Sequence, residues 1–517
     1  MSAPTQTSYD EVEYPSYAYA QTHPDRLATI ATLLGMNPAP INACRVLELG
    51  CGAGGNIVPM AFGLPGSTFI GIDLAAAAIA QGQQFIQALG LKNVSLHQLD
   101  VMAVSEELGK FDYIIAHGIF SWVPQVVRDR MLAICRSHLN DHGVAYISFN
   151  AYPGCRLREI VRDIMLFHTR DVTDITERVE QGRGVIKWIA EAQKEKNSYA
   201  RFLSETATRL ADRSVGSIYH DEMSEINDPF YFHEFAKHAS QHNLQFLSEA
   251  DYFEGSVPND LTDEVVAQVK QLNEQDPLAK EQYLDLLKGR SFRQSLLCHR
   301  EVALARHPIT DRVKNLFIRS RAESVSAQPD VRSDKPEEFR STKGAAAVTD
   351  NPLAKAALVF LNKIYPQTVS FQDLMTNAVD LANLGSPDEQ LSNMLASILT
   401  ATYSVDLIEL RVQEGVFAAI PSSFPLASPI ARYQLQQANI VTTLFHNTLR
   451  LEGSLACELP RLLDGTRDRT ALISEMTQII KSNQTYDEAR KNEFLRDLPQ
   501  ELEKRLAELA NLGLLLG

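Results

Sequence analysis

Short apolar runs alternate with longer amphipathic stretches between residues 44 and 150. Five runs rich in β-branched residues predict strands, at 45–50, 68–73, 93–100, 111–118 and 143–150. Apolar positions at helical spacing lie between them, around 55–63, 76–90 and 124–139. Strands separated by helices form right-handed βαβ units, which place helices on both faces of a parallel sheet. The pattern predicts an α/β fold with a doubly wound, mostly parallel sheet.

The next stretch has helical spacing without strand-like runs. Residues 155–235 are therefore expected to form a helical insertion, whose apolar stripe would pack within the chain or form the face of a homodimer. Strand-like segments at 244–254 and 291–301 follow, so residues 236–305 are expected to complete the sheet.

The last third of the chain predicts smaller units. Residues 306–350 include a polar stretch without periodicity and are expected to form a linker. Residues 351–425 show three helical patterns and then a strand, which suggests a winged-helix-like domain. Residues 426–517 suggest a further helical or winged-helix-like region. Because Lys and Arg are few around 352–420, we expect protein contact there and no nucleic acid.

Length and composition limit the possible classes of protein. A chain of 517 residues is too long for one core, and its formal net charge of −15 does not favour nucleic-acid binding. Six cysteines without a CxxC pair give no support for a zinc site, so no metal is expected. The sequence has neither a signal-peptide pattern nor an apolar run of roughly 20 residues, so we expect a cytoplasmic protein without membrane insertion.

The segment with the clearest chemistry follows the first predicted strand, with the sequence Val-Leu-Glu-Leu-Gly-Cys-Gly-Ala-Gly-Gly at 46–55. A strand that runs into a glycine-rich turn and a helix lets the backbone approach a polar ligand. Gly50, Gly52 and Gly55 also fit the dinucleotide pattern GxGxxG, so NAD stays an alternative. Glu48 favours a ligand that carries an ammonium group, such as S-adenosylmethionine.

Two further acids end the next two strands. Asp73 is placed to reach ribose hydroxyls, a contact that NAD would also use, and Asp100 is placed to accept from an adenine amino group. With Glu48 and the glycine turn, they would meet at the carboxyl ends of the strands. Together these residues favour S-adenosylmethionine as the cofactor.

The sequence resembles the class I S-adenosylmethionine-dependent methyltransferases. Within them it is similar to the rickettsial-type bacterial protein lysine methyltransferases, which carry a regulatory domain and a C-terminal winged-helix domain. The similar segments are 8–14, 22–35, 44–61, 69–74, 111–124, 143–154, 227–235, 292–299 and 462–469. The alanine run 75–78 departs from the family, which usually has a polar residue after the acid of the second strand.

The resemblance implies a seven-stranded Rossmann-like sheet, with the cofactor-binding core at 44–154 and residues 1–43 as an arm and first helix. The arm, including Tyr9, Tyr14 and Tyr19, would cover the cofactor as a lid, although a disordered tail is the alternative. The cofactor-binding residues it implies are Tyr17, His23, Glu48, Gly50, Gly52, Gly54, Asp73, Leu74, Asp100, Val101 and His117.

By the same resemblance the acceptor is a lysine of a protein substrate. A lysine amine must lose a proton first, which costs roughly 4 kcal/mol at neutral pH, and an apolar aromatic channel lowers that cost. Asn150, Tyr152 and Trp122 are the candidate catalytic residues at this channel, each with a purely structural role as the alternative. The polar cluster 220–222 is expected to be a solvated helix end. A small-molecule methyltransferase and a non-catalytic cofactor-binding regulator stay open.

Overall fold

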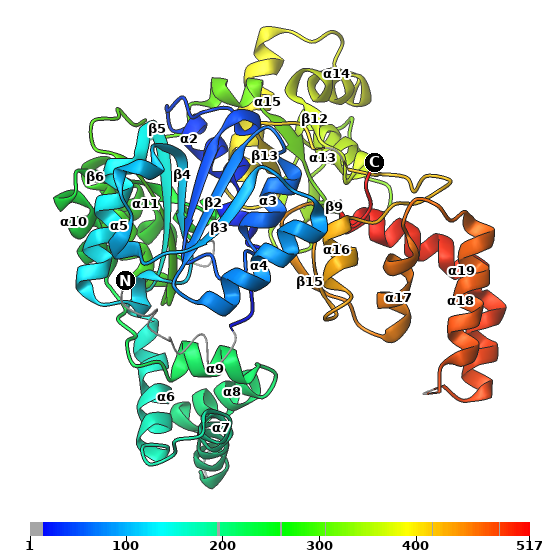
Figure 1. The fold of residues 1–517 in the computed structure, drawn as a ribbon. Helices are drawn as coiled ribbons and strands as arrows, with labels where there is room; N and C mark the ends of the chain where they lie inside the picture. Colours follow the sequence, from blue (N-terminus) through cyan, green and yellow to red (C-terminus); the bar gives the residue numbers. More distant parts are fainter. Residues whose placement is uncertain (1–13, 194–196, 259–260, 306, 416, 485) are drawn as a thin grey trace.

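A computed structural model describes residues 14–193, 197–258, 261–305, 307–415, 417–484 and 486–517. Its centre is a seven-stranded sheet in the order β3-β2-β1-β4-β5-β7-β6, in which β7 is antiparallel to both neighbours (Figure 1). The strands are β1 (Arg45–Leu49), β2 (Thr68–Asp73), β3 (Val94–Gln98), β4 (Phe111–Ala116), β5 (Leu139–Asn150), β6 (Leu244–Glu249) and β7 (Phe292–His299). This arrangement confirms the predicted fold class.

Helices cover both faces of the sheet because its central strands are apolar on both sides. The face of Val46 packs against α2, α3 and α4, and the face of Leu47 packs against α5 and α10. These helices are α2 (Pro24–Leu33), α3 (Ile57–Gly63), α4 (Ala76–Leu89), α5 (Gln125–His138) and α10 (Phe232–Gln241). Two more, α11 (Asp263–Gln275) and α12 (Pro277–Lys288), connect β6 to β7.

The predicted insertion forms a helical lobe below the sheet in Figure 1. Its helices are α6 (Cys155–His168), α7 (Ile175–Ala192), α8 (Ser198–Ala211) and α9 (Val215–Glu222). Met165, Ile186 and Leu203 belong to a core of its own. The lobe ends at α9, earlier than the expected boundary at 235, because Phe235 of α10 packs into the core of the sheet.

The segment 306–350 differs from the expected linker. It contains β8 (Phe317–Arg319), β9 (Glu323–Ser324), β10 (Glu337–Arg340) and β11 (Ala346–Thr349). β9, β10 and β11 form a small antiparallel sheet, and β8 pairs with two later strands. Such short strands lack a visible periodicity, yet Ile318 and Phe339 are buried.

The remaining chain forms two further units, each with its own core. The first contains α13 (Pro352–Ile364), β12 (Val369–Ser370), α14 (Phe371–Ala382), α15 (Glu389–Tyr403) and β13 (Glu409–Arg411), with β8 between β12 and β13. The second contains α16 (Pro429–Gln434), β14 (Ile440–Thr442), β15 (Thr448–Arg450), α17 (Ser454–Leu462), α18 (Arg469–Ser482) and α19 (Glu488–Asn511).

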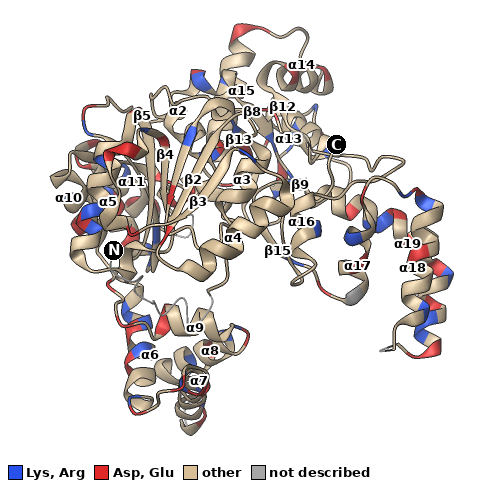
Figure 2. Cartoon of the chain, viewed as in Figure 1, with Lys and Arg blue, Asp and Glu red and all other residues tan. Residues whose placement is uncertain are grey.

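The last unit packs against the sheet domain through α16 and α4 (Figure 1). There the ring of Tyr433 stacks on that of Phe85, with centroids 4.8 Å apart. Lys and Arg alternate with Asp and Glu along α18 and α19 in Figure 2. None of the helices in the described ranges combines the length and the apolar character that a membrane span requires.

Candidate cofactor site

A cavity of about 1120 Å³ opens at the carboxyl ends of the parallel strands. It is the place where doubly wound sheets bind ligands. Most of the expected cofactor residues line it, namely Tyr17, Glu48, Gly50, Gly52, Asp73, Leu74, Asp100, Val101 and His117. Strand ends that are far apart in the sequence therefore meet in one crevice.

The glycine turn is held in place by β2. The N–H groups of Gly50 and Cys51 both donate to the carbonyl of Ile72, at 2.9 and 3.0 Å. Asp73 then accepts from the N–H of Gly52 at 2.8 Å and from the N–H of Ala75 at 2.9 Å. This carboxylate thus shapes the turn and also bonds the start of α4, where the alanine run supplies no polar cap.

Gly54 is not among the residues that line the cavity. Its φ of +74° is left-handed, and a Cβ there would lie 2.9 Å from both Leu96 and Val58. The expected cofactor contact of Gly54 is therefore not what the structure shows. This glycine allows α3 to pack closely on the sheet.

The N-terminal arm lies directly on the glycine turn. Ser16 Oγ accepts from the N–H of Gly55 at 2.8 Å, and a Cβ at Gly55 would lie 2.5 Å from the carbonyl oxygen of Ser16. Tyr14, Tyr17 and Tyr19 line the cavity. The described part of the arm therefore lies at the cavity, its role as a lid over the cofactor stays a prediction, and Tyr9 lies outside the described residues.

His23, an expected cofactor residue, lies elsewhere. Its Nδ1 accepts from the N–H of Asp25 at 3.2 Å and caps α2, and it is not among the residues that line the cavity. Burial holds the pKa of His23 well below its usual value, so the ring is neutral and can accept this bond. The need to satisfy the free N–H groups of a helix start explains its position.

Glu48 is buried near the end of β1, and only one of its two oxygens has a hydrogen-bond partner among the described residues. Its Oε1 accepts from Asn56 Nδ2 at 2.6 Å, and its Oε2 has no hydrogen-bond partner among the described residues. Burial raises the pKa of Glu48 to about 8, and the hydrogen bond from Asn56 opposes this effect. A ligand with an ammonium group would bond Oε2 and favour the ionised form.

The raised pKa of Glu48 predicts a dependence of stability on pH. The ordinary pKa is 4.5 and the folded one is about 8, so folding favours the protonated form and stability falls as pH rises between these values. At pH 7 Glu48 is ionised in the unfolded chain, and this lowers the free energy of unfolding by about 3 kcal/mol relative to its value at low pH. We expect Glu48→Gln to be more stable than the wild type at pH 7 and equal to it at pH 4.5, in urea titrations without cofactor. Glu107→Gln, at an exposed position, serves as the control. If the free energy of unfolding of Glu48→Gln and that of the wild type changed in parallel with pH, the prediction would be wrong.

Asn56 connects this carboxylate to the far end of the chain. Because its Nδ2 donates to Glu48, its Oδ1 must accept, and it does so from Thr22 Oγ1 at 3.0 Å and from the N–H of Tyr19 at 3.1 Å. His446 Nε2, in the turn between β14 and β15, is a third partner at 2.9 Å. The sequence carries no signal for a contact between positions that are 390 residues apart.

The hairpin of β14 and β15 also holds the arm. Thr448 Oγ1 accepts from the N–H of Ala18 at 3.0 Å and lies 3.1 Å from the carbonyl of the same residue. These contacts place the last unit of the fold against the N-terminal arm beside the cavity.

On the acceptor side, the structure brings two of the three candidate catalytic residues to the cavity. Trp122 lines it and donates its Nε1–H to the carbonyl of His220 at 3.1 Å. Asn150 also lines it and donates Nδ2–H to Asn227 at 2.8 Å, while its buried Oδ1 has no partner among the described residues.

Tyr152 does not line the cavity. Its hydroxyl bonds Glu159 in the first turns of α6, and the guanidinium of Arg156 lies 3.8 Å from the centre of its ring. These neighbours are close in the sequence and draw the side chain away from the crevice. The proposed role of Tyr152 at the acceptor is therefore not supported.

The segment 220–222 is buried and is not the solvated helix end that the sequence suggested. His220 and Glu222 are 2% and 3% exposed. Asp221 lines the cavity and accepts from the hydroxyl of Tyr14 at 3.3 Å, and Arg213 pairs with it. The insertion therefore contributes both Asp221 and Arg158 to the wall of the crevice.

One group with metal-ligating side chains lies away from the cavity, between α5 and α10. Ligand atoms of Asp129, His238 and His242 all lie within 4.8 Å of one another. His238 Nε2 lies 2.6 Å from Asp129 Oδ1, so a hydrogen bond already accounts for this pair.

Three family models match successive parts of the chain. A methyltransferase domain matches residues 47–145, a predicted methyltransferase regulatory domain 215–299, and a PKMT C-terminal winged-helix domain 424–514. The last match places a winged-helix domain in the final unit. The uncharacterized protein RP789 of Rickettsia prowazekii is 32% identical over 513 residues, which cover 96% of this chain and 90% of the relative.

Solved structures agree with these matches. The structure of PKMT2 from Rickettsia typhi in complex with AdoHcy is 25% identical, with a TM-score of 0.84 over 98% of this chain and 100% of that one. The fold and the crevice thus define an S-adenosylmethionine-dependent methyltransferase. Within that class, the chain belongs to the family that combines a methyltransferase domain, a methyltransferase regulatory domain and a PKMT C-terminal winged-helix domain.

Proposed function

We propose that this methyltransferase modifies lysine side chains of a protein substrate. The observation that carries the proposal is Asn150, which lines the cavity and whose buried Oδ1 has no partner among the described residues and can accept an amine N–H. The walls nearby are aromatic, with Tyr14, Tyr19 and Trp122. The name PKMT, for protein lysine methyltransferase, belongs to the winged-helix model and to the Rickettsia typhi protein.

Bound S-adenosylmethionine supplies the methyl group from its sulfonium. We propose that Glu48 Oε2 accepts from its ammonium group and that Asp73 and Asp100 accept from its ribose and adenine. Leu74 and Val101 also line the cavity and would offer apolar contact to the base in this proposal.

The acceptor lysine enters past Asp221 and Tyr14 in this proposal. The aromatic walls of the cavity remove water from the ammonium. Desolvation lowers the pKa of an amine, so the neutral form becomes accessible without a strong base. The residues of the channel then act by orientation and exclusion of water.

Asn150→Ala tests the acceptor site. We expect kcat to fall on the order of tenfold to a hundredfold, because one oriented hydrogen bond to the reacting nitrogen is lost. The affinity for S-adenosylhomocysteine, measured by calorimetry, should change by less than about threefold, because Asn150 is proposed to hold only the acceptor. The exposed Asn393→Ala is the matched control, and wild-type kcat in Asn150→Ala would reject the assignment.

The substrate class is tested with the full-length protein and S-adenosylmethionine that carries a deuterated methyl group. The mixture contains lysine-rich purified proteins and a bacterial extract with its small molecules retained. We expect peptide mass spectrometry to find the label on lysine Nζ. Label only in small molecules would reject the lysine proposal and favour the alternative acceptor class, and label in neither fraction would favour a cofactor-binding regulator.

We also propose that the helical lobe forms a homodimer face. Phe167 and Trp188 on α6 and α7 are 71% and 67% exposed, which is unusual for residues of this size. We expect light scattering to show a dimer that Phe167→Glu with Trp188→Glu converts to a monomer. The exposed Phe424→Glu is the control, and a monomeric wild type at micromolar concentration would contradict the proposal.

A further inference from the structure

His117 follows β4 and lines the cavity beside the proposed acceptor site. Its ring lies against that of Tyr19, with centroids 3.8 Å apart, and meets the edge of Phe292. Burial lowers the pKa of His117 to about 3, so the ring is neutral and carries one N–H. Which of its two nitrogens carries that hydrogen decides what the ring offers to a ligand.

A chain of hydrogen bonds behind the ring fixes this choice. Gln294 Nε2 donates to Asp251 Oδ2 at 3.1 Å. Because a carboxylate can only accept, the amide of Gln294 has one orientation, and its Oε1 must be the acceptor for the hydroxyl of Tyr146 at 2.8 Å. The single hydroxyl proton of Tyr146 is then engaged, so its oxygen accepts from His117 Nδ1–H at 2.8 Å.

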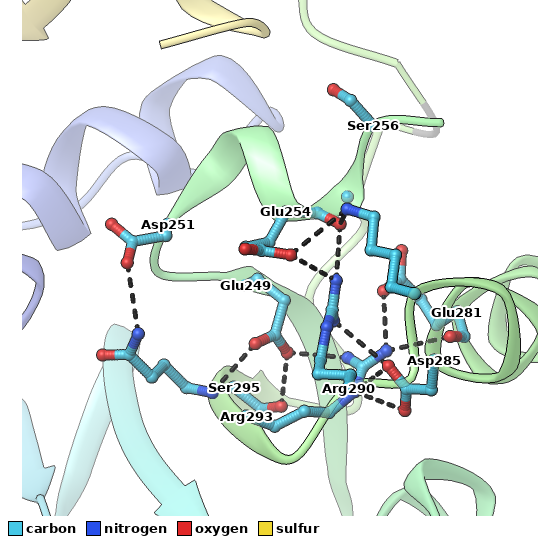
Figure 3. A network of polar contacts seen from close by, with 12 residues as sticks. Glu249, Asp251, Glu254, Ser256, Glu281, Asp285, Arg290, Arg293 and Ser295 are labelled. Carbon is cyan, nitrogen blue, oxygen red and sulfur yellow. Dashed lines mark hydrogen bonds and ion pairs between the residues drawn. The ribbon is translucent and has the colours of Figure 1, made fainter. Parts of the chain in front are cut away.

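This chain rests on a rigid part of the fold. The backbone N–H of Gln294 donates to Glu249 Oε2 at 2.8 Å, and the adjacent Arg293 is fully buried among carboxylates (Figure 3). The other oxygen of Asp251 lies 3.7 Å from Arg26 Nη1. Gln294 and Asp251 therefore have little freedom to reverse the direction of the hydrogen bonds.

With Nδ1 protonated, Nε2 of His117 keeps its lone pair. We propose that His117 Nε2 and Asn150 Oδ1 accept the two N–H groups of the neutral lysine amine, which leaves the amine lone pair free to face the methyl donor. This inference rests on the proposed function. His117 directly follows β4 and Asn150 ends the neighbouring parallel strand β5. The loop after β4 is tied to β5 through Gly118 N–H to Ser148 Oγ and Asn150 N–H to Ser121 Oγ, at 2.8 and 2.9 Å.

His117 acts here as a positioning acceptor and not as the base. A ring with such a low pKa does not hold the proton that the lysine ammonium loses, so this proton leaves to solvent before the amine is aligned. The arrangement suits a primary amine, which has two N–H groups. A monomethylated amine has one and a dimethylated amine has none, so each further methylation is expected to be slower than the one before.

The tautomer can be measured without any turnover. We would record ¹⁵N spectra of the full-length protein with ¹⁵N-labelled histidine and saturating S-adenosylhomocysteine, and assign His117 by loss of its signals in His117→Gln. We expect Nδ1 at the position of a protonated nitrogen and Nε2 at that of an unprotonated one. In Tyr146→Phe, the two shifts should move toward each other as the tautomers mix. A protonated Nε2 in the wild type would overturn the inference, whatever the substrate is.

Butylamine then probes the acceptor contact. We expect its addition to the cofactor-product complex to shift the Nε2 resonance, because an N–H donor engages the lone pair. If S-adenosylhomocysteine alone causes the whole shift and butylamine adds none, the partner of Nε2 is the cofactor and the inference is wrong. With any accepted substrate, Tyr146→Phe should lower kcat on the order of tenfold and leave the KM of the cofactor unchanged. Failure of the lysine proposal itself would appear separately, as absence of labelled lysine in the mass spectra.

Discussion

Asp73→Asn should lower the affinity for S-adenosylhomocysteine by on the order of a hundredfold or more. Both oxygens of Asp73 accept from backbone N–H groups, those of Gly52 and Ala75. An amide nitrogen at either position would face another donor, so one of the two bonds must break. Either the glycine turn or the start of α4 would then lose its hydrogen bond to this side chain, and the proposed ribose contact would weaken at the same time.

Calorimetry with the full-length protein measures this effect. Asp141→Asn, at an exposed position, is the matched control and should bind like the wild type. Asp73→Asn should remain folded, because its neighbours in β2 are unchanged. Affinity within about threefold of the wild type would show that the turn does not depend on this carboxylate.

Arg293→Ala should destabilise the sheet domain by about 3–5 kcal/mol, the usual effect of breaking a buried ion pair. Arg293 is fully buried, and its guanidinium bonds Asp285 at 2.9 Å, Glu249 at 2.7 Å and Glu281 at 3.1 Å (Figure 3). The ring of Phe232 lies 4.0 Å from the same guanidinium. Without the arginine, buried carboxylates would stay without a counter-charge.

Chemical denaturation followed by tryptophan fluorescence would report this loss as a lower midpoint. Arg505→Ala is the control, because Arg505 forms only exposed pairs on α19 that contribute little. Arg293→Lys keeps the charge without the planar fork and should fall between the two. An unchanged midpoint in Arg293→Ala would contradict this prediction. It would mean that the three acids become protonated without a cost in stability, or that water reaches them.

The sheet could be predicted because its signal is local. Strands such as 45–50 and 68–73 are short, apolar and separated by helical spacing, and burial on both faces requires that pattern. The order of Glu48, Asp73 and Asp100 at strand ends likewise placed them in one crevice. These features follow from the chain's own periodicity.

Other features depend on contacts that no local pattern encodes. In the sequence, Gly54 is indistinguishable from the other glycines of the turn. Only the close approach of Leu96 and Val58 shows that this glycine allows α3 to pack on the sheet. Tyr152 has the right place in the sequence for the acceptor site, yet Glu159 takes its hydroxyl. Asn56 is important because it donates to Glu48 and also bonds His446 in a hairpin that is distant in the sequence. The strands within 306–350 were missed for the same reason, since each is only two to four residues long.

The hairpin of β14 and β15 has a consequence for the binding and release of the cofactor. Thr448 bonds the backbone of Ala18 in the arm beside the crevice. His446 bonds Asn56, the residue whose amide donates to Glu48. If the cofactor exchanges by movement of the arm, that movement must break the hydrogen bonds between Ala18 and Thr448 of the final domain. We then expect the residence time of the cofactor to depend on this hairpin, so that a ligand that moves the hairpin would change turnover without entering the crevice.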